Sequence, residues 1–307
     1  MTDYARLIDT ATWAFIRASE AAYPADTSGF SFAQHRATYD AMCAVFRRPL
    51  PDGISTSEVK VAGVPCRIYH GGQPTVIYYH GGGYFLGGLQ SHDDVCAEIC
   101  ARTGLTVVSV DYRLSPEHHH PAAHDDAVAV TLEIATQGAV LLVGDSAGGN
   151  LAASVAHALR AHPVEVLGQV LIYAGLGGDP DKGSYLTHAQ APMLTTADVI
   201  ASARLHHGGK LPVADPTAHP LCDTDFAGLP PTIAIAAECD PISDDSAAYA
   251  AAITADGGRA VAVTEAGLVH GYLRARHTVP RAAASFTRIC DGITDLSLGR
   301  WPPRSLK

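Results

Sequence analysis

Short apolar runs rich in β-branched residues alternate with helical patterns along most of this chain, and this alternation limits the folds it can adopt. Such runs suit strands that are buried on both faces; they occupy residues 75–79, 105–110, 140–143, 168–173, 232–236 and 260–264. The helical patterns occupy residues 91–103, 121–137, 147–161, 243–256 and 278–292. Ahead of them, residues 57–62 and 65–70 predict an antiparallel pair of strands. Because strands separated by helices normally pair in parallel, we predict an α/β protein whose mostly parallel central sheet has helices on both faces.

Two segments fall outside this alternation. Residues 1–50 have a helical pattern, interrupted at Tyr23-Pro24 and ended by proline and glycine. Residues 176–212 contain glycines, prolines and one short helical stretch, which is typical of an insertion. We therefore predict that residues 51–307 form the main domain, and that residues 1–50 and the insertion form a helical cap over one end of its sheet.

The composition favours a packed globule with small-molecule partners. Of the 307 residues, 47% are apolar and 17% are charged, and the formal net charge of −10 argues against nucleic acid or an anionic membrane surface as partner. The seven cysteines include no C-x-x-C pair and no zinc spacing, which favours a reduced compartment. Charged residues interrupt the N-terminus where a signal peptide needs an apolar core, and no apolar run approaches the roughly 20 residues of a membrane span. We predict a cytoplasmic protein; the sequence leaves the oligomeric state open, with a homodimer as one alternative.

The pentapeptide Gly144-Asp145-Ser146-Ala147-Gly148 lies between a predicted strand and a predicted helix. This is the G-x-S-x-G nucleophile elbow in the structural context that it requires. The turn is so sharp that the serine takes a strained conformation, and the two glycines let the strand and helix pass close together. A chance match is the alternative in a chain with 29 glycines, and the flanking strand and helix argue against it. Ser146 is the predicted nucleophile.

The segment His80-Gly81-Gly82-Gly83-Tyr84 directly follows another predicted strand. Acyl transfer passes through a tetrahedral oxyanion, which needs preset backbone N–H donors, and glycine lets the main chain approach the reacting carbon closely. A plain tight turn or a phosphate-binding loop is the alternative, but no Lys-Ser/Thr pair or G-x-G-x-x-G frame supports phosphate binding. Together with the serine turn, the glycines predict an oxyanion hole.

The remaining catalytic groups are expected after the serine, in the order acid and then histidine. Glu238, Asp240, Asp244 and Asp245 follow one late apolar run, and His270 follows the next. Both loops are expected at the carboxyl end of the sheet, where the serine lies. Asp240 is favoured because it comes directly after the strand and before a proline that keeps it extended. Asp244 and Asp245 fall in the first turn of the next helix, where the helix dipole accounts for carboxylates.

Five segments in this order resemble the hormone-sensitive-lipase-like family of bacterial esterases, and within it the acetyl esterases of the GDSAG subgroup. They are HGGGYFLGG (80–88), DYRLSPEHHHPAAHDD (111–126), GDSAGGN (144–150), DPISDD (240–245) and HGY (270–272). Tyrosine stands at positions 84 and 272, where the family commonly has phenylalanine, and Ile242 stands where leucine is common. The resemblance implies an α/β-hydrolase fold and a carboxylic ester hydrolase that acts on short acyl chains and needs no cofactor.

The same resemblance implies roles for individual residues. Ser146 would be the nucleophile, His270 the base and Asp240 its orienting acid. The backbone N–H groups of Gly82, Gly83 and Ala147 would donate to the oxyanion, and the helical cap would cover the acyl and alcohol pockets. Tyr84 and Asp145, which adjoin the glycines and the serine, are further expected to contact the substrate.

Three other interpretations accompany this one. An amidase or a lactonase would use the same machinery, and the sequence does not separate these activities. A non-catalytic small-molecule receptor is disfavoured because all three catalytic positions are filled. A metal site built from His118-His119-His120, His124, Asp125 and Asp126 is also disfavoured, because adjacent histidines cannot all point at one ion without a contorted backbone.

Overall fold

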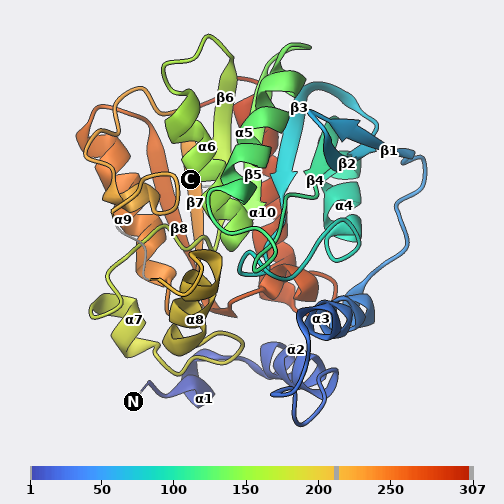
Figure 1. Cartoon of the computed structure of the whole chain (residues 1–307), viewed down its shortest axis with the longest axis vertical. Helices are drawn as coiled ribbons and strands as arrows, with labels where there is room; N and C mark the ends of the chain where they lie inside the picture. The colour runs from blue at the N-terminus through green and yellow to red at the C-terminus, as the bar shows by residue number, and fades with distance from the viewer. Residues whose placement is uncertain (1, 211–213, 304–307) are drawn as a thin grey trace.

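The computed structural model describes residues 2–210 and 214–303, and within them eight strands form one sheet (Figure 1). Across the sheet the strands lie in the order β1-β2-β4-β3-β5-β6-β7-β8. Their bounds are β1 Thr56–Val61, β2 Val64–Tyr69, β3 Gly72–Tyr79, β4 Leu105–Val110, β5 Val140–Asp145, β6 Val166–Ile172, β7 Thr232–Cys239 and β8 Ala260–Val269. Strand β2 pairs antiparallel with β1 and β4, and the other neighbours pair in parallel, which confirms the predicted mostly parallel sheet.

Strands β7 and β8 run further than the sequence predicts, to Cys239 and Val269 in place of residues 236 and 264. The polar residues that make these segments look like strand ends have partners within the fold. Glu238 accepts a hydrogen bond from the backbone N–H of residue 267, at 2.6 Å. The side chain of Glu265 forms an ion pair with an arginine of the last helix. The extra length delivers the two loops that follow to the same edge of the sheet.

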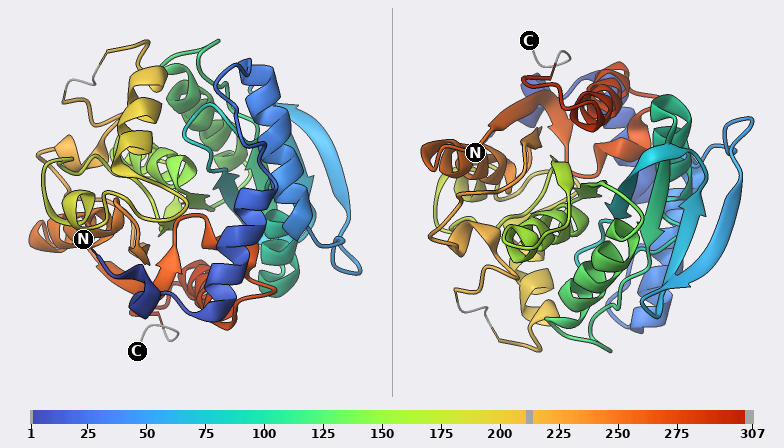
Figure 2. Two further views of the ribbon diagram at one scale, coloured as in Figure 1. Left: turned by 90° about the horizontal axis from the view of Figure 1, so that it is seen from below. Right: turned by 90° about the horizontal axis from the view of Figure 1, so that it is seen from above.

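Helices cover both faces of the sheet, because alternate residues of each buried strand point to opposite sides. In β3, Val76 and Tyr78 pack into one core and Ile77 and Tyr79 into the other. The first face is covered by α4 (Asp93–Thr103) and α10 (Pro280–Ser297), and the second by α5 (Ala122–Ala135), α6 (Ala147–Leu159) and α9 (Ser243–Ala255). Figure 2 shows the sheet and the helices on its two faces from below and from above the view of Figure 1.

The remaining α-helices gather at the lower end of the molecule in Figure 1, where the parallel strands end. They are α1 (Tyr4–Leu7), α2 (Thr10–Ala21), α3 (Phe32–Phe46), α7 (Gly183–Thr187) and α8 (Thr196–His206). Ser31 and Thr195 begin α3 and α8 with capping boxes, which satisfy backbone donors at the helix starts. These helices come from the segments 1–50 and 176–212; residues 1, 211–213 and 304–307 of the predicted domains lie outside the described residues.

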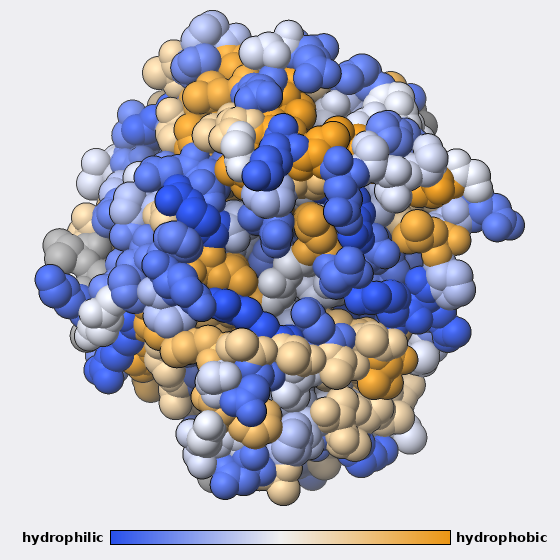
Figure 3. Space-filling model, turned by 45° about the vertical axis from the view of Figure 1, so that its right-hand side comes forward, coloured by the Kyte–Doolittle hydropathy of each residue, from blue (hydrophilic) through white to orange (hydrophobic). Residues whose placement is uncertain are grey.

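The surface is mixed in character. On the face shown in Figure 3, hydrophilic side chains surround separate apolar patches. Among the helices of residues 2–210 and 214–303, none has the length and apolar character needed to cross a membrane.

Candidate active site

Ser146 lies in a sharp turn between β5 and α6. Its backbone has φ +55° and ψ −121°, a region that residues other than glycine seldom adopt. Two glycines make the turn possible. A Cβ atom at Gly144 would lie 2.2 Å from the carbonyl oxygen of Gly148, and a Cβ atom at Gly148 would lie 1.9 Å from that of Tyr79. A larger residue fits at neither position, so strand, turn and helix are packed backbone against backbone around the serine.

A chain of two hydrogen bonds connects Ser146 to a buried carboxylate. The Nε2 atom of His270 lies 2.9 Å from the Ser146 hydroxyl oxygen, and its Nδ1 atom lies 2.7 Å from Oδ2 of Asp240. Asp240 follows β7 and is fully buried, and its Oδ1 accepts the backbone N–H of Ile242 at 3.1 Å. Both loops lie at the carboxyl ends of neighbouring strands, β7 and β8, which brings the three side chains together.

The other acidic residues near the end of β7 have partners away from His270. Glu238 accepts the backbone N–H of Gly267 within β8, as described above. Asp244 accepts the backbone N–H of Ser184 at 2.8 Å, in addition to its position in the first turn of α9. Of the four acidic residues that the sequence offers, Asp240 is therefore the one that the structure brings to the imidazole.

Asp245 is buried and connects α9 to the segment that follows β6. Its Oδ2 accepts the backbone N–H groups of Leu176 and Gly178, at 2.7 and 3.3 Å, and the hydroxyl of Tyr185 at 3.1 Å. Burial raises the pKa of Asp245 to about 6, although these hydrogen bonds oppose the shift. The helix-dipole explanation that the sequence suggests is thus incomplete, because this side chain also holds the chain that leads into α7.

The glycine loop after β3 borders the same cavity as Ser146. Gly82 and Gly83 have φ values of +127° and +59°, and a Cβ atom at Gly82 would lie 2.3 Å from the carbonyl oxygen of Leu86. Among the hydrogen bonds of residues 2–210 and 214–303, none uses the backbone N–H of Gly82 or Gly83. Tyr84 also has a positive φ, +67°, and borders the cavity. The loop therefore presents unused donors next to the serine turn.

Asp145 connects the glycine loop to the serine turn by a hydrogen bond. It is 2% exposed, and its carboxylate accepts the backbone N–H of Gly81 at 3.0 Å and the hydroxyl of Tyr78 at 2.7 Å. The Nε2 atom of His92 lies 3.3 Å away, and the hydroxyl of Tyr173 lies 3.4 Å away. Burial by itself would raise the pKa of Asp145, but His92 and the hydrogen bonds hold it below its ordinary value. The described hydrogen bonds of the Asp145 carboxylate therefore connect the serine turn to the glycine loop and to neighbouring side chains.

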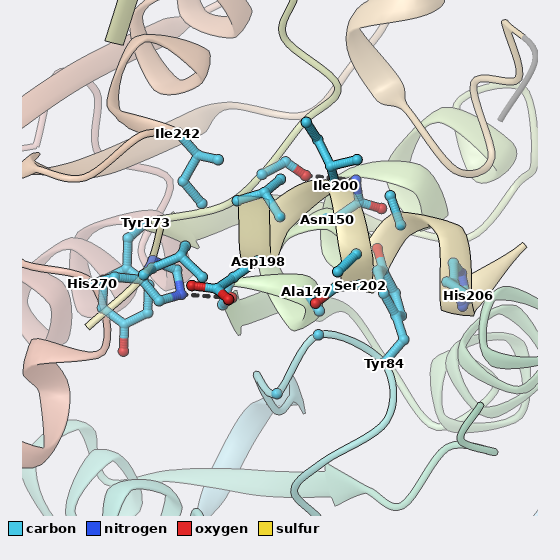
Figure 4. A pocket seen from close by; sticks show the side chains of 18 of the residues that line it. Tyr84, Ala147, Asn150, Tyr173, Asp198, Ile200, Ser202, His206, Ile242 and His270 are labelled. Carbon is cyan, nitrogen blue, oxygen red and sulfur yellow. Dashed lines mark hydrogen bonds between the residues drawn. The ribbon is translucent and has the colours of Figure 1, made fainter. Parts of the chain in front are cut away.

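A cavity of about 1110 Å³ lies above these groups. Its walls come from α2 and α3, the glycine loop, the serine turn, the segment 175–207 and the loop of His270. Figure 4 shows Tyr84, Ala147, Ile200, Ile242 and His270 around this space, and much of its lining is apolar. A site of this size with a few converging polar groups is typical of a pocket for a small molecule.

His119 and His120 contact the segment that carries α8. The Nδ1 atom of His119 lies 3.0 Å from the carbonyl oxygen of Leu205, and Nε2 of His120 lies 3.2 Å from a carboxylate oxygen of Asp215. Within the described ranges, no three His, Cys, Asp or Glu side chains come together in an arrangement that could hold a metal ion. These histidines join the main domain to the helices at the carboxyl end of its sheet.

Three residues around the site were not anticipated. Asn150 donates from Nδ2 to the carbonyl oxygens of Gly175 and Ala218, at 2.7 and 2.9 Å, and so connects α6 to the segment after β6. His206 of α8 packs on the glycine loop, and Arg274 borders the cavity four positions after His270. Asn150 stands in the motif GDSAGGN, which could have singled it out; nothing in the sequence distinguishes His206 from fifteen other histidines.

Comparisons with known proteins agree with this geometry. A sequence model of a family described as the alpha/beta hydrolase fold matches residues 76–274. The carboxylesterase NlhH of Mycobacterium tuberculosis is 37% identical over 251 residues, 77% of either chain. The carboxylic ester hydrolase LipN of the same organism is 33% identical over 263 residues, 78% of this chain and 69% of LipN. A hyperthermophilic esterase from the archaeon Pyrobaculum calidifontis has a TM-score of 0.83 at 30% identity, over 95% of this chain and 99% of that one. The chain belongs to the α/β-hydrolase family, among its hormone-sensitive-lipase-like esterases.

Proposed function

We propose that this esterase acts through an acyl intermediate on Ser146, with His270 as general base and Asp240 as the acid that orients it. The hydrogen-bonded chain from Asp240 through His270 to Ser146, with distances of 2.7 and 2.9 Å, is the observation that carries the proposal. A serine hydroxyl is a weak nucleophile until an adjacent base accepts its proton. The arrangement of base and third group seen here is the one that such activation needs.

In the proposed reaction, Ser146 Oγ attacks the ester carbonyl carbon while Nε2 of His270 accepts the hydroxyl proton. The same nitrogen then donates this proton to the oxygen of the leaving alcohol, and the acyl group stays on the serine. Water, activated in the same way, attacks the acyl ester and releases the acid. Asp240 accepts a hydrogen bond from Nδ1, which fixes the tautomer whose Nε2 is free to accept a proton.

We assign the oxyanion hole to the backbone N–H groups of Gly82, Gly83 and Ala147. The unused donors of the two glycines and the position of Ala147 at the start of α6 support this assignment, because N–H groups at a helix start point away from it and stabilise negative charge. Tyr84 would border the bound substrate. In place of the direct substrate contact that the sequence suggests for Asp145, we propose that its carboxylate positions the glycine loop through Gly81.

We further propose esters with short acyl chains as substrates. The motif GDSAGGN resembles that of acetyl esterases, and the ethyl acetate hydrolase of Pseudomonas putida is 27% identical over 247 residues, 75% of this chain and 78% of that one. Helices α1 to α3, α7 and α8 would act as the cap over the pocket. A cytoplasmic location is supported by seven cysteines that are all free, and a net charge of −10 argues against nucleic acid as a partner. A homodimer remains one alternative for the assembly.

Hydrolysis of p-nitrophenyl acetate, butyrate and laurate, together with mass analysis after treatment with an organophosphonate, tests this function. We expect faster turnover of the acetate and butyrate, and one phosphonate bound to the wild-type protein but none to Ser146→Ala. Equal labelling of Ser146→Ala would overturn the assignment of the nucleophile, and faster turnover of the laurate would overturn the short-chain class. Anilide and lactone substrates of the same acyl length, assayed in parallel, distinguish an esterase from an amidase or a lactonase.

A further inference from the structure

An arginine borders the active-site cavity beside the catalytic histidine. Arg274 lies in the 3-10 helix η2 (Tyr272–Ala275), which directly follows His270 and Gly271. A Cβ atom at Gly271 would lie 3.3 Å from Nη1 of Arg274, so the glycine lets the guanidinium lie against the backbone next to the base. The positive charge therefore lies at the wall of the cavity, close to the backbone of the loop that carries His270.

The direct partners of this guanidinium come from α3 and carry no charge. Nε of Arg274 donates to the Cys43 sulfur at 3.1 Å, a terminal N–H donates to the Tyr39 hydroxyl, and the guanidinium carbon lies 5.0 Å from the centre of the Tyr39 ring. Burial raises the pKa of both the Cys43 thiol and the Tyr39 phenol, so both are neutral near pH 7. Among residues 2–210 and 214–303, no group accepts a hydrogen bond from Nη1 of Arg274.

A carboxylate at ion-pair distance is missing for Arg274 among residues 2–210 and 214–303. The negative charge of Asp145 favours the charged form of Arg274, but from beyond ion-pair distance. The Asp145 carboxylate accepts its hydrogen bonds from groups such as Tyr78 and Gly81. The contrast within the same segment is clear: Arg276 forms ion pairs with Asp94 at 2.6 Å and with Glu98 at 2.7 Å. A cation taken out of bulk water is costly unless a counter-charge accompanies it.

We propose that Arg274 binds a carboxylate carried by the substrate, so that the preferred esters are anionic. This inference rests on the proposed function and narrows its substrate class. The planar guanidinium matches a carboxylate with two parallel hydrogen bonds, and a cavity with a largely apolar lining strengthens such a contact. The carboxylate belongs to either half of the ester: to the acyl chain of a dicarboxylic acid monoester, or to the alcohol of an acylated hydroxy acid.

Two pairs of esters test the proposal and identify the half of the substrate that carries the charge. p-Nitrophenyl hydrogen glutarate is compared with p-nitrophenyl valerate for the acyl side, and γ-acetoxybutyrate with butyl acetate for the alcohol side. For one pair we expect the ratio of kcat/KM, anionic over neutral, to fall by about 10- to 100-fold in Arg274→Met, mainly through KM. Arg274→Lys should keep part of the preference. Arg102→Met, which removes an arginine from the distant helix α4, should leave both ratios unchanged.

A binding measurement keeps the proposal separate from the hydrolytic function. Glutarate should raise the unfolding temperature of the wild-type protein and compete with p-nitrophenyl acetate, and both effects should be lost in Arg274→Met. Equal losses on anionic and neutral esters, or glutarate binding that survives in Arg274→Met, would show that Arg274 only holds α3 in place. If Arg274→Met does not fold, absence of any glutarate effect on the wild type and on Arg274→Lys overturns the proposal. A wild type that binds glutarate but hydrolyses no ester would contradict the proposed function alone.

Discussion

The rings of Tyr84 and His206 are stacked, with centroids 3.8 Å apart and an angle of 9° between their planes. Tyr84 follows the glycine loop and His206 ends α8, so this contact joins the proposed oxyanion hole to the proposed cap. Burial, together with the neighbouring histidines, lowers the pKa of His206 to about 3. The stacked imidazole is therefore neutral near pH 7, and a proton on it would disfavour its buried position.

We predict that acid weakens this protein through His206. An unfolded imidazole titrates near pH 6.5 and the folded one near 3, so between these values the unfolded state binds more protons. The free energy of unfolding should therefore fall as the pH decreases through this window. His206→Phe keeps a stacking ring that cannot be protonated, and should reduce the acid-dependent loss by up to about 3 kcal/mol. Urea unfolding from about pH 7 to about pH 4 measures this difference.

His162→Phe provides the matched control, because His162 is exposed and distant from the cavity. It should show the pH dependence of the wild type. An equal slope in His206→Phe and wild type would contradict the prediction.

Asp240→Asn should fold normally and lower kcat by up to about 10⁴-fold, because an amide favours the wrong tautomer of His270. Asp244→Asn should change kcat little and cost about 1 kcal/mol at most, through its position at the start of α9 and its bond to Ser184. Steady-state kinetics and thermal unfolding of both variants check this ranking. If Asp244→Asn were inactive and Asp240→Asn active, the orienting acid would have to be reassigned.

Asp145→Ala should impair catalysis without removing Ser146. The methyl side chain leaves the backbone N–H of Gly81 and the hydroxyl of Tyr78, which both donate to Oδ1 of Asp145, without this acceptor, so the glycine loop should shift. Loss of one well-placed oxyanion donor lowers kcat by about 10²- to 10³-fold, and we expect a loss in this range. Phosphonate labelling and ester kinetics should be measured together. A variant that keeps wild-type kcat would show that the loop holds its position without this carboxylate.

Asp245→Ala should destabilise the fold by about 3 kcal/mol, because it leaves the buried N–H of Leu176 and the partly buried N–H of Gly178 without an acceptor. Asp291→Ala, at an exposed position of α10, serves as the control and should cost less than about 0.5 kcal/mol. Chemical unfolding at neutral pH compares the two variants. Similar small losses for both would mean that the segment after β6 rearranges to satisfy its own backbone.

Much of this architecture follows from local sequence patterns. The apolar runs predict the strands because burial on both faces needs continuous β-branched residues. The G-x-S-x-G turn is readable because Gly144 and Gly148 meet backbone atoms that exclude any side chain. The ends of β7 and β8 were predicted too early, since Glu238 and Glu265 gain partners that are distant in sequence. Such long-range partners carry no local signal.

The same limit applies to the walls of the cavity. Arg274 is one of several arginines near the C-terminus, and only the packing of α3 against η2 shows that its direct partners in the described part of the chain are a thiol and a phenol. The stacking of His206 on the glycine loop likewise joins residues that are more than a hundred positions apart. The residues proposed for catalysis follow strands, so the order of the chain predicts them, whereas the other residues that line the cavity depend on how the outer segments pack.

The hydrogen bond between Asp145 and the glycine loop affects which parts of this protein can change in sequence without loss of activity. Asp145 and Ser146 are consecutive residues, so a single peptide unit separates the proposed nucleophile from the group that holds the loop. A displacement of the turn would carry both along together, and their spacing would be preserved. Substitutions on the helices at the other side of the cavity that leave the stacking of His206 on Tyr84 intact should therefore have little effect on the reacting geometry. New substrate preferences could arise in this chain by changes confined to those helices.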